Sequence, residues 1–205
     1  MNKHIDEVAY QIGNVLYLNV TNRCTSACDF CVRSKADGVG GHHLWLSHEP
    51  SVEEVLRDVS RLEREQGANG FSEYVFCGYG EPLMRLDLVK AVAQELKARG
   101  CRVRVNTNGH ANLVHGRNVS VELAGLVDTV SISLNAENPY LYDEMVHSAY
   151  GPDAFGAMVY FAEQCKRYLM KVVLTVVELP GVDLEACRKI AAGIGAEFRA
   201  RRFIE

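Results

Sequence analysis

The 205-residue chain lacks several features that would place it in a specialised class of proteins. No apolar run approaches the roughly 18 residues of a membrane-spanning helix, and the N-terminal segment has acidic residues instead of an apolar signal core. Low-complexity segments and repeats of fixed period are also missing. A formal net charge of −4 gives no support for a nucleic-acid or anionic-membrane partner. These absences favour a cytoplasmic globular protein.

The chain does have an ordinary globular composition, with 48% hydrophobic and 23% charged residues. Its length corresponds to between one and two domains, and no linker-like stretch divides it. We therefore expect one domain over residues 1–205, large enough to bury a core without disulfide bonds. Seven cysteines, an odd number, favour reduced thiols, some of which are available to bind metal.

Apolar runs of strand length alternate with helical patterns along the chain. The predicted strands are residues 15–20, 73–77, 101–106, 127–134, 171–178 and 196–200. The predicted helices are residues 52–65, 86–99, 119–124, 139–146, 152–168 and 184–194. This alternation predicts a parallel sheet with helices outside. Six units are too few for a complete barrel of about 250 residues, so we expect an open α/β fold, a (β/α)6 partial TIM barrel with its chemistry in the loops after the strands.

Three cysteines lie close together directly after the first predicted strand. Cys24, Cys28 and Cys31 follow the pattern Cys-x-x-x-Cys-x-x-Cys within a loop of about residues 21–41. Soft thiolates at this spacing select an iron–sulfur cluster or zinc. Three cysteines leave one iron of a four-iron cubane open to a substrate or cofactor. A closed zinc site needs a fourth ligand instead, and His42 or His43 is available to supply it.

Glycine-rich or polar segments follow the next three predicted strands. Residues 78–82 read Gly-Tyr-Gly-Glu-Pro, where glycine allows close backbone approach and the carboxylate can accept from an ammonium group. Residues 106–109 read Asn-Thr-Asn-Gly. Alternation in residues 131–135 points Ser131, Ser133 and Asn135 to one side. Each segment also has a local explanation, as a plain loop, an Asn-Gly turn or strand hydroxyls paired to backbone.

The segment CTSACDFC, with an aromatic residue before its last cysteine, resembles the signature of the radical S-adenosylmethionine (SAM) enzymes. The resemblance implies a [4Fe-4S] cluster on Cys24, Cys28 and Cys31, with SAM bound to the open iron through its amino and carboxylate groups. It also implies that the reduced cluster cleaves SAM to a 5′-deoxyadenosyl radical, which abstracts hydrogen from a substrate. An external flavodoxin- or ferredoxin-like protein would donate the electron.

Further motifs extend this resemblance to the SAM site. GYGEP stands where the family has Gly-Gly-Glu-Pro, and Tyr79 replaces the first glycine of that motif. The resemblance implies that residues 78–81 contact the methionine end of SAM and that strand ends contact its ribose or adenine. The implied cofactor-binding residues are Gly78, Tyr79, Gly80, Glu81, Asn106, Asn108, Ser131 and Ser133.

The whole string of motifs is most similar to the TatD-associated radical SAM proteins, a group often encoded beside, or fused to, a TatD-type metal-dependent hydrolase. The string comprises LYLNVTNRCTSACDFC, FCGYGEPL, RVNTNG, SISLNA and FRARRFIE. The resemblance implies the initial radical chemistry but does not identify the substrate, the product or a catalytic residue. Because the chain stops near the sixth strand, we expect a wide barrel mouth that suits a macromolecular substrate or a partner such as a TatD-type protein.

Other interpretations stay open at this point. An activating enzyme for a glycyl-radical protein, or a small-molecule enzyme similar to the deazapurine-forming radical SAM enzymes, would use the same motifs. A different class is a non-enzymatic zinc or iron–sulfur module on the same cysteines.

Several residues outside the motifs have a structural or a functional interpretation. We expect Cys101, Cys165 and Cys187 to pack in the core, whereas Cys77 adjoins the GYGEP loop. Arg199, Arg201 and Arg202 crowd the C-terminus with Glu205, either as a solvated charged tail or as a site for a carboxylate or phosphate at the barrel rim.

Overall fold

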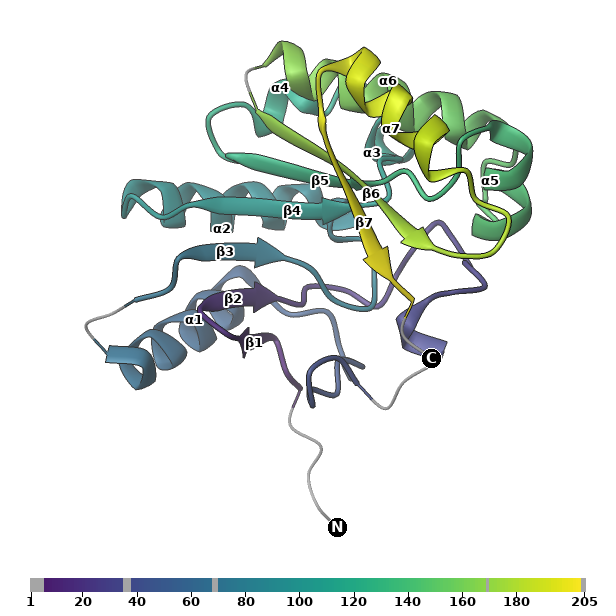
Figure 1. The fold of residues 1–205 in the computed structure, drawn as a ribbon. Coiled ribbons are helices and arrows are strands. Elements are labelled where there is room, and N and C mark those ends of the chain that lie inside the picture. Colours follow the sequence, from purple (N-terminus) through teal and green to yellow (C-terminus); the bar gives the residue numbers. More distant parts are fainter. Residues whose placement is uncertain (1–5, 35–37, 68–69, 169, 204–205) are drawn as a thin grey trace.

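One curved sheet organises the fold, and its strands lie side by side in chain order (Figure 1). The computed structural model describes residues 6–34, 38–67, 70–168 and 170–203. Six strands run parallel: β2 (Val15–Leu18), β3 (Glu73–Phe76), β4 (Val103–Thr107), β5 (Thr129–Ser133), β6 (Lys171–Glu178) and β7 (Glu197–Arg202). The sheet curls until β7 passes in front of the middle strands. The predicted α/β fold with an open, partial parallel barrel is confirmed.

An additional strand, β1 (Ala9–Ile12), precedes the six parallel strands. It pairs antiparallel with β2, with Tyr10 opposite Tyr17 and Ile12 opposite Val15. The chain turns through Gly13, whose φ of 60° costs glycine little and would strain most other residues. The six predicted parallel strands are therefore all present among the described residues, and β1 is an additional antiparallel edge strand that was not predicted.

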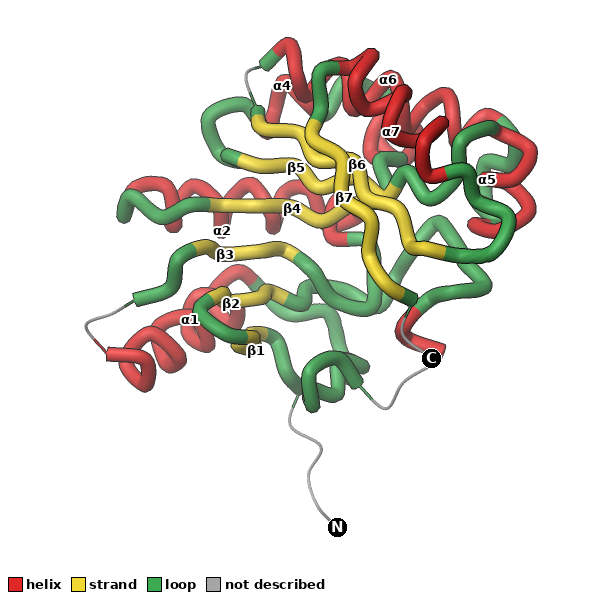
Figure 2. Tube along the Cα trace, viewed as in Figure 1, coloured by secondary structure: helices red, strands yellow, loops and turns green. Residues whose placement is uncertain are grey.

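Helices cover the outer face of the sheet (Figure 2). The α-helices are α1 (Val52–Gln66), α2 (Leu86–Ala98), α3 (Ala111–His115), α4 (Ser120–Leu123), α5 (Pro139–Val146), α6 (Asp153–Arg167) and α7 (Leu184–Ile194). Two 3-10 turns, η1 (Val32–Ser34) and η3 (Pro82–Arg85), lie in loops. The sequence pattern did not indicate α3. Within the described ranges, no helix is both long and apolar enough to cross a membrane.

The helix starts are fixed by local chemistry that the sequence carries. Ser51 Oγ accepts from the backbone N of Glu54 (3.2 Å), and Glu54 Oε2 accepts from the backbone N of Ser51 (2.8 Å). This reciprocal pair is the capping box that holds the first turn of α1. Asp183 caps α7 in the same way, since its Oδ1 accepts from Glu185 N and Ala186 N, both at 2.9 Å.

The two faces of the sheet differ in polarity because successive strand residues point to opposite sides. The face under the helices is apolar, and Leu18, Phe76 and Ile132 are fully buried there. The concave face carries polar residues, including the ion pair between Arg104 Nε and Glu73 Oε2 at 3.1 Å. A polar inner face at the ends of parallel strands is where a (β/α) barrel places its chemistry.

Candidate functional site

A cavity of about 310 Å³ opens where the strand ends meet the cysteine loop. Its volume is at the low end of the roughly 300 to 1,000 Å³ usual for small-molecule sites. Loop, strand-end and helix residues line it: Cys24, Ser26, Cys28, Phe30, Cys31, Val32, Asn108, Ser133, Asn135, Tyr142, Val146, Val177, Arg201, Arg202 and Phe203. The structure thus brings the three predicted cluster ligands together with Asn108 and Ser133.

The three loop cysteines form an electrostatically coupled set of free thiols. Burial, followed by the neighbouring Cys31 and Cys24, raises the pKa of Cys28 to about 12. Burial, followed by the charge of Glu81, also raises the pKa of Cys24, while Arg33 lowers the pKa of both thiols. Thiols that repel one another as anions are stabilised by a shared cation, so this donor set fits an iron–sulfur cluster. Binding would release their protons.

The alternative of a closed zinc site gains no fourth ligand from the loop histidines. His42 Nδ1 lies 2.8 Å from Glu7 Oε1, and its Nε2 lies 3.0 Å from the carbonyl oxygen of Gln11. Neither His42 nor His43 lines the cavity that contains the thiols. Within the described residues, no three His, Cys, Asp or Glu side chains converge as ligands of a single metal ion.

The described part of the cysteine loop is anchored to the end of α5; residues 35–37 of the predicted loop lie outside the described residues. Ala27 N donates to Val146 O, and Asp29 N donates to Met145 O, both at 3.1 Å. Nearer to the cavity, Asn108 Nδ2 donates to Thr25 Oγ1 (3.0 Å) and lies 3.9 Å from Cys24 Sγ. Asn108 therefore links the end of β4 to the cluster loop.

Glu81 is the buried centre of the second predicted motif. Its Oε1 accepts from Thr107 Oγ1 (2.9 Å) and Leu83 N (3.0 Å), and its Oε2 accepts from Asn108 N (2.7 Å). Burial outweighs these three hydrogen bonds and raises the pKa of Glu81 to about 7. Glu81 does not line the cavity. It holds Asn108 in place, and its contact with SAM stays a prediction.

Close packing explains the glycines around Tyr79. A Cβ on Gly78 would lie 1.9 Å from Asn19 Oδ1, and one on Gly80 would lie 2.3 Å from the carbonyl oxygen of Thr21. The Tyr79 side chain is buried in a separate small cluster with Tyr10 and Leu44, outside the cavity lining. A tyrosine can thus replace the first glycine of Gly-Gly-Glu-Pro because its side chain points away from the cavity.

Three polar residues from β4 and β5 face the interior of the partial barrel. Asn106 and Ser131 are register partners, and Ser133 follows at the cavity. A hydrogen bond from Asn106 favours the thiolate of Cys77, although burial raises the pKa of that thiol overall. Cys77 is therefore half-buried on the inner face, whereas Cys165 and Cys187 are buried in the core and Cys101 packs against it, as predicted.

Asn135 occupies a strained position at the cavity. Its φ of 58° is in the left-handed region, which Asn tolerates better than most residues. The residue is 4% exposed, and its Oδ1 has no hydrogen-bond partner among the described residues. A strained backbone and an unpaired buried oxygen at a cavity wall indicate a ligand contact. Strand alternation located this residue, but its backbone conformation had no sequence signal.

His110 and Tyr142 form a buried pair that sequence reasoning missed. His110 Nε2 lies 2.9 Å from Tyr142 Oη, and its Nδ1 lies 3.2 Å from Thr25 Oγ1. Burial lowers the pKa of His110 to about 4, so its ring is neutral near pH 7. The pair connects the cysteine loop to α5, and Tyr142 lines the cavity. His110 comes directly after an Asn-Gly turn, and Tyr142 lies within the apolar pattern of a helix. Neither residue therefore had a sequence feature that marks a functional role.

Comparison with known proteins gives the family. The model described as "Radical SAM superfamily" matches residues 18–192. The probable dual-specificity RNA methyltransferase RlmN of Synechococcus sp. is 30% identical over 154 residues, covering 71% of this chain and 41% of the relative. The probable GTP 3′,8-cyclase of Methanothermobacter thermautotrophicus is 32% identical over 128 residues, covering 62% and 37%. The chain spans less than half the length of these relatives.

Solved structures give the same fold. SuiB of Streptococcus suis superposes with a TM-score of 0.64 at 16% identity, covering 93% of this chain and 39% of that chain. The structure titled native anSMEcpe with bound AdoMet gives a TM-score of 0.62 at 16% identity, covering 93% and 51%. TsrM from Kitasatospora setae, with a [4Fe-4S] cluster bound, gives 0.55 at 13%, covering 91% and 36%. The match to the radical SAM family model confirms the predicted cofactors, a [4Fe-4S] cluster and SAM, as those of the family.

Proposed function

Because the chain belongs to the radical SAM superfamily, we propose that it holds a [4Fe-4S] cluster on Cys24, Cys28 and Cys31 and starts a radical reaction from SAM. The observation that carries the proposal is the convergence of these three thiols on one cavity. When bound, the reduced cluster supplies the electron that cleaves SAM to a 5′-deoxyadenosyl radical. The RNA methyltransferase and the GTP cyclase among the relatives are named for different reactions, so the proposal covers this initial step.

The chain's own residues bind and position the reactants. Arg33 lowers the pKa of Cys24 and Cys28 and so favours two of the thiolates that would ligate iron. Asn108, fixed by Glu81, holds the cysteine loop beside the end of β4. The backbone of residues 78–81 binds the methionine end of SAM. Ser133, with Asn106, Asn108 and Ser131, binds its ribose or adenine.

The motif strings support placing the chain in the TatD-associated subgroup. Within that proposal, residues 1–205 form a single cytoplasmic domain, where thiols stay reduced. A flavodoxin- or ferredoxin-like protein donates the electron, and a TatD-type hydrolase or a macromolecular substrate meets the barrel mouth. A hydrogen atom is taken from a substrate that the motifs do not name.

An anaerobic assay tests the proposed chemistry. The protein is reconstituted with iron and sulfide, reduced with dithionite and mixed with SAM, and 5′-deoxyadenosine is quantified. We expect product from the native chain and from Cys101→Ala, whose thiol lies outside the loop, and none from Cys28→Ala. Equal product from Cys28→Ala and the native chain would refute the assignment of the cluster ligands.

A further inference from the structure

Three arginines crowd the end of β7, where Glu178 of β6 is the register neighbour of Arg202. Arg201 and Arg202 line the cavity, and Arg199 lies two residues before Arg201 on the same face of the strand. None of the three forms an ion pair with a carboxylate in residues 6–34, 38–67, 70–168 or 170–203. Glu205, which the sequence places beside them, lies outside the described residues.

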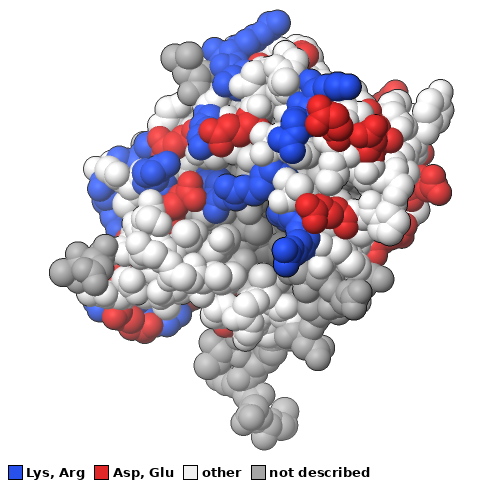
Figure 3. All heavy atoms as spheres, in the orientation of Figure 1, with Lys and Arg blue, Asp and Glu red and all other residues white. Residues whose placement is uncertain are grey.

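Arg104, a neighbouring cation on the inner face, differs from the β7 arginines because it forms an ion pair. Arg104 is paired with Glu73 at 3.1 Å, as expected for a structural arginine. Figure 3 shows Lys and Arg side chains gathered near the centre of this face, where β7 crosses in front of the sheet, beside a hollow. Asp and Glu side chains lie next to them in the same view.

Arg201 is held where its positive charge is disfavoured. Although part of Arg201 is exposed at the cavity mouth, burial of the remainder lowers its pKa. The neighbouring Cys77 thiol opposes this shift, and the like charge of Arg199 adds to it. The cluster thiols are served by another cation, because Arg33 is the arginine that lowers the pKa of Cys24 and Cys28. The guanidinium groups of Arg201 and Arg202, which line the cavity, are therefore available to bind a different anion.

We propose that Arg201 and Arg202, reinforced by Arg199, bind a phosphate group of the substrate. The inference rests on the proposed function, since it places a phosphorylated substrate in the cavity that contains the cluster ligands. Guanidinium groups bind phosphate through paired hydrogen bonds. Adjacent like charges suit a phosphate dianion better than a single carboxylate, because each added negative charge offsets one more cation.

The carboxylate of SAM is the competing anion. In the radical SAM resemblance, that carboxylate binds the open iron together with the amino group of the same molecule, so the iron already offsets its charge. It would leave most of the charge on β7 uncompensated. A phosphate on the substrate would compensate it and would fix the substrate against the side of the cavity formed by β7.

Equilibrium titration under anaerobic conditions tests this site. The probes are inorganic phosphate and ribose 5-phosphate, with ribose as the uncharged control, and both apo and cluster-loaded protein are used. We expect the two phosphates to bind and ribose not to bind. Arg201→Gln and Arg202→Gln should each weaken phosphate binding about tenfold or more, since each removes a charge-assisted contact.

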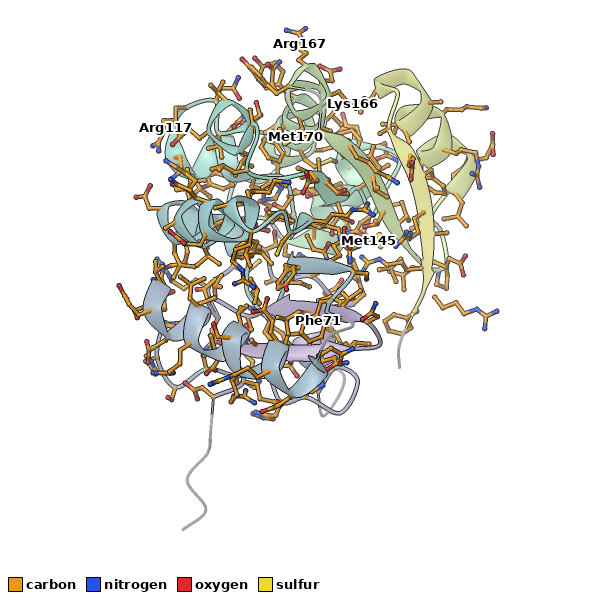
Figure 4. All side chains as sticks on the ribbon, turned by 90° about the vertical axis from the view of Figure 1, so that its left-hand side faces the viewer. Phe71, Arg117, Met145, Lys166, Arg167 and Met170 are labelled. Atoms are coloured by element: carbon orange, nitrogen blue, oxygen red, sulfur yellow. The ribbon has the colours of Figure 1, made fainter. Side chains whose placement is uncertain are left out.

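Arg167→Gln is the matched control, because Arg167 is exposed and extends from the end of α6 away from the sheet (Figure 4). It should leave phosphate binding unchanged. Absence of phosphate binding by the native chain, or equal binding by the Arg201 and Arg202 variants, would overturn the inference. Weaker binding of SAM with unchanged binding of phosphate would also overturn it and assign the arginines to SAM.

The apo measurement separates this inference from the proposed function. Phosphate binding that depends on Arg201 in a protein that never cleaves SAM would sustain the phosphate site and reject the proposed chemistry. Cleavage of SAM by a protein that does not bind phosphate would support the proposed chemistry and reject the phosphate site.

Discussion

At the scale of single residues, two buried titratable groups beside the cysteine loop respond to pH in opposite directions. The pKa of Glu81 rises from 4.5 to about 7 on folding, so the folded chain keeps a proton that the unfolded chain loses. Stability from this group falls as pH rises through that window. The pKa of His110 drops from 6.5 to about 4, so stability from this group falls as pH decreases through its window. The two effects oppose each other between about pH 4.5 and 6.5.

Single substitutions should unmask each effect. In Glu81→Gln only the histidine remains, and the free energy of unfolding should fall on acidification by up to about 1.4 kcal/mol per pH unit. In His110→Gln only the carboxyl remains, and the same quantity should fall as pH rises towards 7. Urea unfolding of the apo protein across this range measures both slopes. Identical slopes in the native chain and both variants would contradict the assignment.

Gly80 tests the packing between the GYGEP segment and the start of the cysteine loop. In Gly80→Ala the new Cβ would lie 2.3 Å from the carbonyl oxygen of Thr21 and 2.6 Å from that of Arg23, so backbone must move. We expect a loss of about 1–3 kcal/mol in the free energy of unfolding and reduced iron after reconstitution.

Gly156→Ala is the control for that substitution. Gly156 lies within α6, and a Cβ there meets nothing within 4 Å. Alanine should stabilise the helix by about 0.5–1 kcal/mol and leave the iron content unchanged. Equal iron loading of both alanine variants would show that the close approach at Gly80 does not position the loop.

At the scale of elements, local signals predicted most of the fold. The capping box at Ser51 and the cap at Asp183 both form, because they depend on residues within one turn. Strand β1, which was not predicted, has a hairpin signal at Gly13-Asn14, but its short sequence shows no clear alternation of apolar and polar residues. The left-handed Asn135 and the contact between His110 and Tyr142 depend on packing between distant segments, so no local pattern predicts them.

Ser51 separates the stability of an element from the function of the site. In Ser51→Ala the side-chain cap of α1 is lost, and the free energy of unfolding should fall by about 1 kcal/mol. Ser60→Ala, in the exposed part of the same helix, should change it by less than about 0.5 kcal/mol. Neither variant should change the iron content. Loss of iron in Ser51→Ala would show that α1 contributes to the cluster site.

At the scale of the whole molecule, the cysteine spacing and the glycine motif located the site before the fold was known. The spacing predicts ligands because one short loop brings its own thiols together. The alternation of strands and helices also placed the β7 arginines at the rim of a partial barrel. The direction of the Tyr79 side chain depends on packing against Tyr10 and Leu44, which are distant in the sequence, so no local pattern predicts it.

The core is continuous without the cluster, and this predicts the result of removing metal. The main buried cluster extends from Val8 to Ala191 through the sheet and its helices, while Cys28 is only partly buried and packs against it. Chelation of iron should leave the far-ultraviolet circular dichroism nearly unchanged and speed amide exchange in residues 24–31. Cooperative loss of the whole dichroism signal on chelation would contradict an independent core.

The central claim is a three-cysteine cluster with an open iron that accepts SAM. Its most direct test is electron paramagnetic resonance of the anaerobically reconstituted, dithionite-reduced protein before and after addition of SAM. We expect the signal of a reduced [4Fe-4S] cluster whose spectrum shifts with SAM, in the native chain and in Cys101→Ala. A full, reducible cluster whose spectrum ignores SAM, or a protein that retains one zinc and assembles no cluster, would contradict it.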